Sequence, residues 1–151
     1  MSKSFSGLFA ATLGYSMEVL SRETGIRPLH STAEVWDHIV ATDETYPGNP
    51  IPRSFIVETP KGNYWTNPNG TKHMNEALNS VKDLPALKNT NPNLMAQFIL
   101  YDFHQAVIKA TSSGTPAYKT KICVEHWEFF FNKRQDDKYP VIYHARFLGL
   151  N

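Results

Sequence analysis

The sequence contains very little of what several common kinds of protein site require. Cys123 is the only cysteine among 151 residues, which excludes an intramolecular disulfide and a zinc site made of several cysteines. We expect Cys123 to be a small residue of the core. No apolar run reaches the roughly 18 residues that a membrane span needs. Because Glu18 interrupts the apolar start of the chain, we interpret that start as a helix of the folded domain.

The chain also has almost no net charge, with a formal value of +1. Domains that bind nucleic acid are usually basic as a whole, so any contact with a polyanion would have to come from a local patch of cations. The motifs GxxxxGK[ST], GxGxxG, GxSxG and HExxH are all absent, which removes support for nucleotide-cofactor folds, serine hydrolases and zincins. We expect a site that uses no metal and no cofactor.

What is present is enough for one domain with a real core. The composition is 41% hydrophobic and 13% aromatic, and the length is usual for a single domain over residues 1–151. We expect a helical N-terminal part over residues 1–45. Apolar spacing predicts one helix over residues 8–23, and the capping-box pattern that begins at Ser31 predicts a second. The apolar stripe of that second helix consists of Val35, Trp36, Ile39 and Val40.

A hairpin and two further helices are expected next, in the first part of a catalytic core over residues 51–151. Residues 45–54 are dense in proline and glycine and predict a loop, followed by a hairpin of residues 54–59 and 64–66. An Asn-Pro-Asn-Gly turn then leads into a helix that begins near Thr71. Asn91 and Pro92 predict the start of the longest helix, which ends near residue 110.

The last quarter is rich in aromatic and β-branched residues. We expect residues 118–131 and 140–149 to form a long antiparallel hairpin. The fold class predicted is therefore α+β, with N-terminal helices packed on a small antiparallel sheet.

Side chains alternate between the two faces of a strand. If Phe131 pairs with Val141, one face of the hairpin is apolar and must be buried, with Tyr143 on it. On the other face Glu128 then lies opposite His144, and His126 lies opposite Arg146. The hydrophobic pattern favours this pairing, or one that differs from it by two residues.

Two histidines, a glutamate and an arginine on one face can do chemistry. Imidazole and carboxylate groups transfer protons, and arginine holds a phosphate. One alternative is a solvated outer face whose ion pairs are worth only about 0.2–1 kcal/mol each. Another is a metal held by His126, His144 and Glu128, which the positive charge of Arg146 on the same face opposes.

The first turn of the helix near Thr71 holds a second pair of ionisable groups, Lys72 and His73. This pair can be a solvated helix end. It can also bind an anion, because the first turn of a helix presents unpaired backbone N–H groups.

Four segments in this order resemble a known family. They are IPRSFIVE, YWTNPNGTKHM, HWEFFF and PVIYHARF, and they cover about residues 51–148. They are similar to the C-terminal toxin domains of bacterial polymorphic toxins, including contact-dependent inhibition exoproteins and LXG-type secreted toxins. His126 departs from the family pattern, where a small residue often precedes the Trp-Glu pair.

This resemblance implies a small nuclease, most often one that cleaves RNA. It implies secretion as part of a larger toxin, action in the cytoplasm of a competing target cell, and a cognate immunity protein that blocks the site. It implies a fold comparable to the microbial RNase and EndoU-like group. The family residues that match are Lys72, His73, Glu128 and His144.

The hypothesis is therefore a metal-independent endoribonuclease in which His73 and His144 act as acid and base. Glu128 would orient a histidine and Arg146 would stabilise phosphoryl charge. Candidates for substrate binding are Lys72, Thr71, His126, Trp65 and Tyr143, the last two by stacking on a base. The alternatives are a metal-dependent DNase toxin and a non-enzymatic immunity or binding module.

Overall fold

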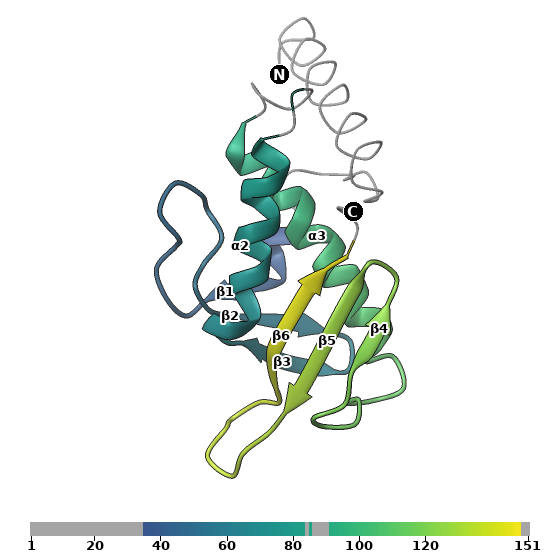
Figure 1. The fold of residues 1–151 in the computed structure, drawn as a ribbon. Helices are drawn as coiled ribbons and strands as arrows, with labels where there is room; N and C mark the ends of the chain where they lie inside the picture. Colours follow the sequence, from purple (N-terminus) through teal and green to yellow (C-terminus); the bar gives the residue numbers. More distant parts are fainter. Residues whose placement is uncertain (1–34, 84, 86–90, 149–151) are drawn as a thin grey trace, which may run out of the picture.

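In the computed structural model, which describes residues 35–83, 85 and 91–148, two long helices lie against a six-stranded sheet (Figure 1). The fold class is α+β. The strand order is β1-β2-β3-β6-β5-β4. Among the described residues, no helix combines the length and the apolar character that crossing a bilayer requires. The elements are η1 (Val35–Asp37), β1 (Ile39–Ala41), β2 (Phe55–Thr59), β3 (Gly62–Thr66), α2 (Pro68–Lys82), α3 (Pro92–Ala110), β4 (Ile122–Val124), β5 (Trp127–Asn132) and β6 (Val141–Phe147).

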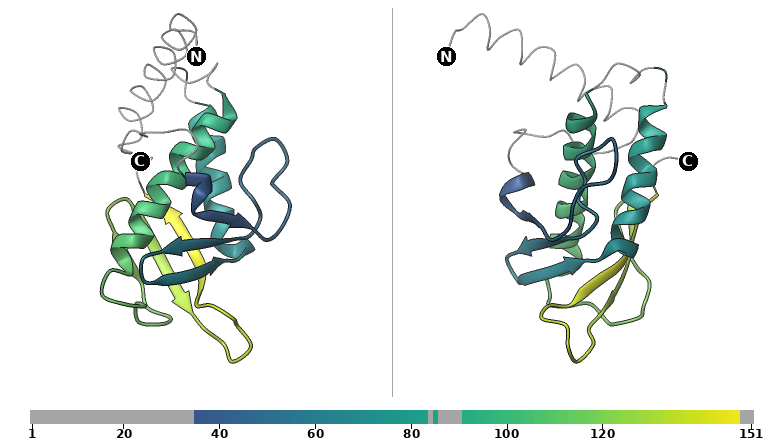
Figure 2. Two further views of the ribbon diagram at one scale, coloured as in Figure 1. Left: turned by 180° about the vertical axis from the view of Figure 1, so that it is seen from behind. Right: turned by 90° about the vertical axis from the view of Figure 1, so that its left-hand side faces the viewer.

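The sheet is mixed, so the expectation of a purely antiparallel sheet is wrong. β3 and β6 pair in parallel, and all the other pairs are antiparallel. The sheet is also strongly twisted: β2 and β3 run almost horizontally in Figure 1, whereas β5 and β6 run steeply. The further views in Figure 2 show α2 and α3 side by side, with the strands below them.

The core forms where α3 meets one face of β5. Trp127, Phe129 and Phe131 alternate along β5 and are fully buried. The ring of Phe103 in α3 contacts Trp127 and Phe129 edge-on, with centroid distances of 5.5 and 5.8 Å. The indole N–H of Trp127 donates to Asp102 Oδ2 at 2.9 Å, which satisfies its polar group in the interior. The opposite face of β5 is left partly open to solvent.

Elements with strong local signals were predicted correctly. The hairpin of β2 and β3 is present. α3 begins as expected, because the side chain of Asn91 accepts a hydrogen bond from the backbone N–H of Asn93 at 2.8 Å and Pro92 occupies the first helical position.

The second N-terminal helix is wrong where the structure describes it. Val35–Asp37 is only a short 3₁₀ turn, and Ile39–Ala41 is a strand that pairs with β2. Pairing with an existing edge buries Ile39 and favours its β-branched side chain. The helix expected over residues 8–23 and the cap at Ser31 lie outside the described residues.

The single strand predicted over residues 118–131 is also wrong. Glu125 and His126 form a turn that separates β4 from β5, and Glu125 has a positive φ of 54°. The two strands then pair as a hairpin of their own. Cys123 lies on β4 and is exposed, so the prediction of a core cysteine is wrong. β4 is the last strand of the sheet and has neighbours on one side only.

The pairing of β5 with β6 differs from the favoured register by two residues, which was the stated alternative. Phe129 lies opposite Ala145, and Glu128 lies opposite Arg146. Near Phe131 the register shifts, so that Phe131 lies opposite Ile142 and Phe130 opposite His144. Tyr143 is thus the extra residue of a β-bulge, which re-aims side chains locally. Tyr143 is therefore only half-buried and is not part of the buried face, contrary to expectation.

Candidate functional site

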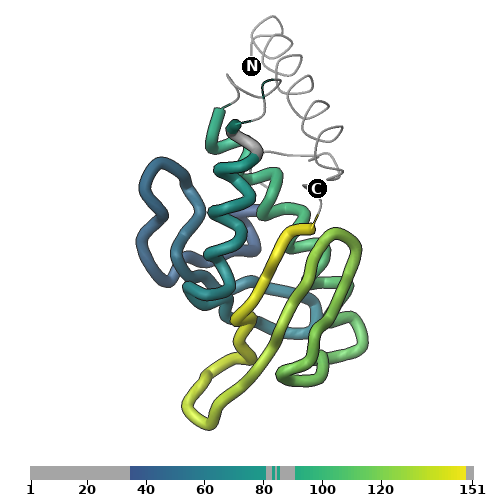
Figure 3. Tube along the Cα trace, in the orientation of Figure 1, coloured from purple at the N-terminus to yellow at the C-terminus, as the bar shows by residue number. Residues whose placement is uncertain are grey.

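The site depends on the way α2 comes to lie beside β6. β3 pairs only with the first two residues of β6, through Trp65 with Val141 and Thr66 with Ile142. Beyond Ile142 the chain of β3 turns into α2, which runs along the remaining length of β6, as the tube in Figure 3 shows. A side chain on α2 can therefore meet side chains on β6 that β3 would otherwise have covered.

α2 begins three residues earlier than predicted, so the expected turn is wrong. Asn67 is the N-cap, because its Oδ1 accepts a hydrogen bond from the backbone N–H of Gly70 at 2.9 Å. Pro68 then takes the first helical position, which suits a residue without an N–H group. Lys72 and His73 consequently lie on the second turn of the helix and not on the first.

Thr71 is fully buried and holds α2 to the loop that precedes β2. Its hydroxyl donates to the carbonyl oxygen of Arg53 at 2.7 Å and lies 2.7 Å from the hydroxyl of Tyr46. Its backbone N–H donates to the carbonyl oxygen of Asn67 at 3.1 Å. The N–H that was expected to bind an anion is thus already used inside the protein.

Gly70 sets the distance between α2 and β6, because it lies against the backbone of Ile142 with no room for a Cβ atom. From that contact, His73 is three residues along α2 and His144 is two residues past Ile142 along β6. These steps correspond to rises of about 4.5 Å and about 6.6 Å, so the two side chains arrive at similar heights. Their ring centroids are 5.2 Å apart, with an angle of 69° between the ring planes.

Each of the two imidazoles is held by its own carboxylate. His144 Nε2 lies 2.9 Å from Glu128 Oε2, and His73 Nδ1 lies 2.7 Å from Glu76 Oε1. A carboxylate that accepts from one ring nitrogen fixes the tautomer, and the other nitrogen then gives or takes a proton. The nitrogens left for a substrate are Nδ1 of His144 and Nε2 of His73.

Glu128 is the anionic centre of the cluster. The hydrogen bond from His144 is the largest influence that lowers the pKa of Glu128, and the positive charge of Lys121 acts in the same direction. Lys121 Nζ lies 3.7 Å from Glu128 Oε1, and Arg146 is the cross-strand neighbour of Glu128. Glu128 is therefore ionised at neutral pH, with two cations beside it.

Both histidines are partly accessible, as proton transfer to a substrate requires. The side chains of His73 and His144 are 34% and 23% exposed, whereas Glu128 is 16% exposed. The ring of Phe130, which lies opposite His144 on β5, contacts the rings of both His144 and Tyr143, with centroid distances of 5.2 and 5.8 Å. Phe130 thus gives the site an apolar side.

The other predicted site residues lie on β6, on α2, in the turn before β5 and on β3. Arg146 and Lys72 are exposed on β6 and α2 respectively, on the two elements that carry the histidine pair. His126 lies in the turn between β4 and β5, where its ring contacts Phe147 at a centroid distance of 6.2 Å. Trp65 donates its indole N–H to Thr42 Oγ1 at 2.9 Å.

Two members of the cluster, Glu76 and Lys121, were not predicted. Glu76 had a usable signal, because a residue three positions after His73 lies on the same side of a helix. Lys121 had none, because its approach to Glu128 depends on the turn at residues 125–126 that folds β4 back onto β5.

The described residues contain no group of three or more histidine, cysteine, aspartate or glutamate side chains placed to hold a metal ion. What the geometry offers is a pair of imidazoles with one nitrogen each available, next to Lys121 and Arg146. Such a pair can remove a proton from one atom and deliver a proton to another across a short distance.

No family model matches the chain, and no curated protein shows significant similarity to it.

Proposed function

We propose that this chain is the endoribonuclease domain of a bacterial toxin and that it cleaves RNA without a metal ion. One observation carries the proposal: His73 and His144, which come from different elements, meet at 5.2 Å, and each has a carboxylate partner. Two histidines on a solvated surface are not expected to lie in ring contact with one nitrogen of each ring bonded to a carboxylate.

In the proposed reaction, one histidine takes the proton of a ribose 2′-hydroxyl. The 2′-oxygen attacks the adjacent phosphorus, and the bond from phosphorus to the 5′-oxygen breaks. The other histidine gives its proton to the departing 5′-oxygen, which leaves a 2′,3′-cyclic phosphate and a free 5′-hydroxyl. Acid–base catalysis of this kind contributes typically about 10²–10⁴-fold to the rate.

The cations around the pair have a role in the same reaction. Negative charge builds on the phosphoryl oxygens as the 2′-oxygen attacks, and fixed positive groups stabilise it. Lys121 and Arg146 flank Glu128, and Lys72 precedes His73 on α2. This local patch compensates for a whole-chain charge of only +1. Glu128 and Glu76 act as positioning residues for the two imidazoles.

The motifs that resemble polymorphic toxin domains support the biological setting. Their histidines and glutamate, at positions 73, 128 and 144, are far apart in the sequence and belong to one cluster in space. We therefore propose an RNA substrate in a competing cell, delivery as part of a larger secreted protein, a cognate immunity protein, and kinship with the microbial RNase and EndoU-like group.

Inducible expression in a bacterial host tests this function. Growth arrest together with fragmentation of total RNA is expected for the native chain, and neither is expected for His144→Ala. His38→Ala is a matched control, because His38 is a partly exposed histidine that stacks on His104 and lies outside the cluster. Normal growth with intact RNA would contradict the proposal and favour a binding module. DNA breakage that disappears in EDTA would favour a metal-dependent DNase.

A further inference from the structure

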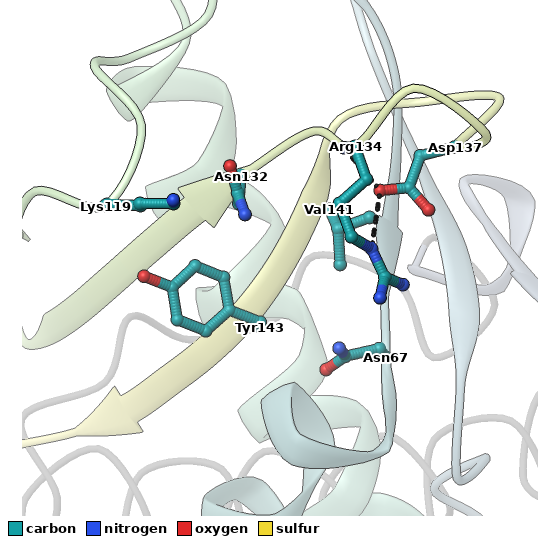
Figure 4. Close-up of a pocket in the computed structure, with 7 residues that line it drawn as sticks. All are labelled: Asn67, Lys119, Asn132, Arg134, Asp137, Val141 and Tyr143. Carbon is teal, nitrogen blue, oxygen red and sulfur yellow. Dashed lines mark hydrogen bonds and ion pairs between the residues drawn. The ribbon is translucent and has the colours of Figure 1, made fainter.

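A hollow of about 430 Å³ is lined in part by Tyr143, the residue before His144 on β6. Its size is in the range of small-molecule sites. Its lining residues do not include His73 or His144, so it offers room for substrate groups other than the reacting phosphate. Its lining comes from the start of α2, the loop before β4, the ends of β5 and β6 and the loop between these two strands: Asn67, Lys119, Asn132, Arg134, Asp137, Val141 and Tyr143 (Figure 4).

The lining has the composition of a site for a flat, polar, aromatic ligand. Figure 4 shows the ring of Tyr143 with Lys119 and Asn132 to one side, and with Arg134 and Asn67 to the other. A tyrosine ring and a guanidinium plane both stack on nucleobases. Amide side chains form hydrogen bonds with the edge of a base.

Several of these groups are held in place without a ligand. Asn67 Oδ1 accepts from the N–H of Gly70, which leaves the amide Nδ2 of Asn67 to donate outward. Asp137 Oδ2 accepts from the backbone N–H of Arg134 at 2.7 Å and lies 3.5 Å from Arg134 Nε. Because Asp137 and Arg134 are paired, the carboxylate does not leave an unbalanced negative charge in the hollow.

The backbone conformation of Lys119 also supports a ligand site at this loop. Its φ is +57°, in the left-handed region that a lysine rarely adopts. Its backbone N–H donates to the carbonyl oxygen of Phe131 at 2.8 Å, which fixes the loop against the end of β5. Strained positions of this kind concentrate at ligand sites.

The hollow lies next to the proposed catalytic pair along the chain, because its lining residue Tyr143 precedes His144 on β6. Tyr143 and His144 are adjacent on β6, and Phe130 contacts both rings. On the α2 side, Asn67 is six residues before His73, a rise of about 9 Å. A nucleotide whose phosphate lies at the histidines can therefore place its base in the hollow.

We propose that this hollow is the base-binding subsite of the enzyme. It takes the nucleobase of the ribonucleotide whose phosphate is attacked, with Tyr143 stacking on the base and with Asn67 and Asn132 bonding to its edge. The inference rests on the proposed function for the identity of the ligand. It adds that substrate affinity depends on the base and not only on phosphate and sugar.

Binding of small ligands tests the subsite without any RNA cleavage. Titration calorimetry would compare the native protein with the four 3′-nucleoside monophosphates and with ribose 3-phosphate, which lacks a base. We expect at least one nucleotide to bind tenfold or more tightly than ribose 3-phosphate, because stacking alone contributes about that much. Tyr143→Ala and Asn132→Ala should each reduce this ratio severalfold and leave binding of ribose 3-phosphate unchanged. Tyr143→Phe should keep the ratio.

Equal binding of all four nucleotides and ribose 3-phosphate would overturn the subsite. So would a ratio that survives in both folded alanine variants; if Tyr143→Ala does not fold, Asn132→Ala decides. The proposed function and the subsite can fail independently. A protein that prefers nucleotides to ribose 3-phosphate but cleaves no RNA would contradict the nuclease and leave a nucleotide-binding site. A protein that cleaves RNA but binds nucleotides and ribose 3-phosphate equally would support the nuclease and contradict the subsite.

Discussion

Gly70 of α2 lies directly against the backbone of Ile142 in β6. A Cβ atom at position 70 would be 2.5 Å from the carbonyl oxygen of Ile142 and 2.8 Å from the side chain of Thr66. The strand backbone cannot give way as a flexible side chain can. The absence of a side chain at this position therefore allows the close approach that brings His73 to His144.

Gly70→Ala should consequently destabilise the protein, although alanine is normally the better helix residue by about 0.5–1 kcal/mol. We expect a net loss of about 1–3 kcal/mol from overpacking, measured by urea unfolding. Asn69→Ala, an exposed change in the same helical turn, should shift the unfolding free energy by no more than about 0.5 kcal/mol. A Gly70→Ala protein as stable as the native one would show that the helix can move away without cost.

Glu128 gives a prediction about stability and pH. Its pKa in the folded protein is below the ordinary value of 4.5, first because it accepts the hydrogen bond from His144. Its contribution to stability is therefore fully present above about pH 4.5 and is lost as the pH falls through the lower folded pKa. The difference in unfolding free energy between the native protein and Glu128→Gln should shrink from pH 6 to pH 3. A difference that stays constant would contradict the ionised pair, and Glu44→Gln, an exposed change, is the control.

The two carboxylates should differ in their importance for activity. Glu128 is 16% exposed and Glu76 is 53% exposed, so solvent screens the pair of Glu76 with His73 more strongly. We expect Glu128→Gln to lower kcat/KM by about 10–100-fold, as loss of an orienting partner does elsewhere. Glu76→Gln should have a smaller effect. A structural role alone would leave the pH profile of kcat unchanged in both variants, whereas a positioning role moves it.

Arg146 should act through charge on RNA binding. In a catalytically inactive His73→Ala background, Arg146→Ala should weaken binding for every sequence and lower the slope of log K against log salt by about 1. Lys61→Ala removes an exposed cation in the turn between β2 and β3 and should leave the slope unchanged. Equal effects of the two changes would indicate unspecific attraction and not a phosphate contact at the cluster.

The parts of this fold that follow from neighbouring residues were predictable. The cap of α3 at Asn91 and the hairpin of β2 and β3 are encoded within a few residues. The start of α2 was missed because Asn-Pro-Asn-Gly suits both a turn and a capped helix. Asn67 and Pro68 nevertheless carry the same cap signal as Asn91 and Pro92, and α2 begins with it.

The site was predictable in its residues but not in its arrangement. The alternation along β5 placed Glu128 on an open face, and the register differing by two residues was already a stated alternative. The bulge at Tyr143 and the parallel pairing of β3 with β6 depend on contacts between distant segments. These two features decide that Tyr143 turns to the open face and that α2 lies beside His144.

The most direct test of the two-histidine mechanism is an RNA cleavage assay in EDTA. It compares the purified native protein with His73→Ala and His144→Ala on a short RNA. The native protein should cleave the RNA to a 2′,3′-cyclic phosphate and leave the 2′-deoxy analogue intact. Each folded alanine variant should be slower by about 10²–10⁴-fold. A folded variant that cleaves at the native rate, or native cleavage of the 2′-deoxy analogue, would contradict the mechanism.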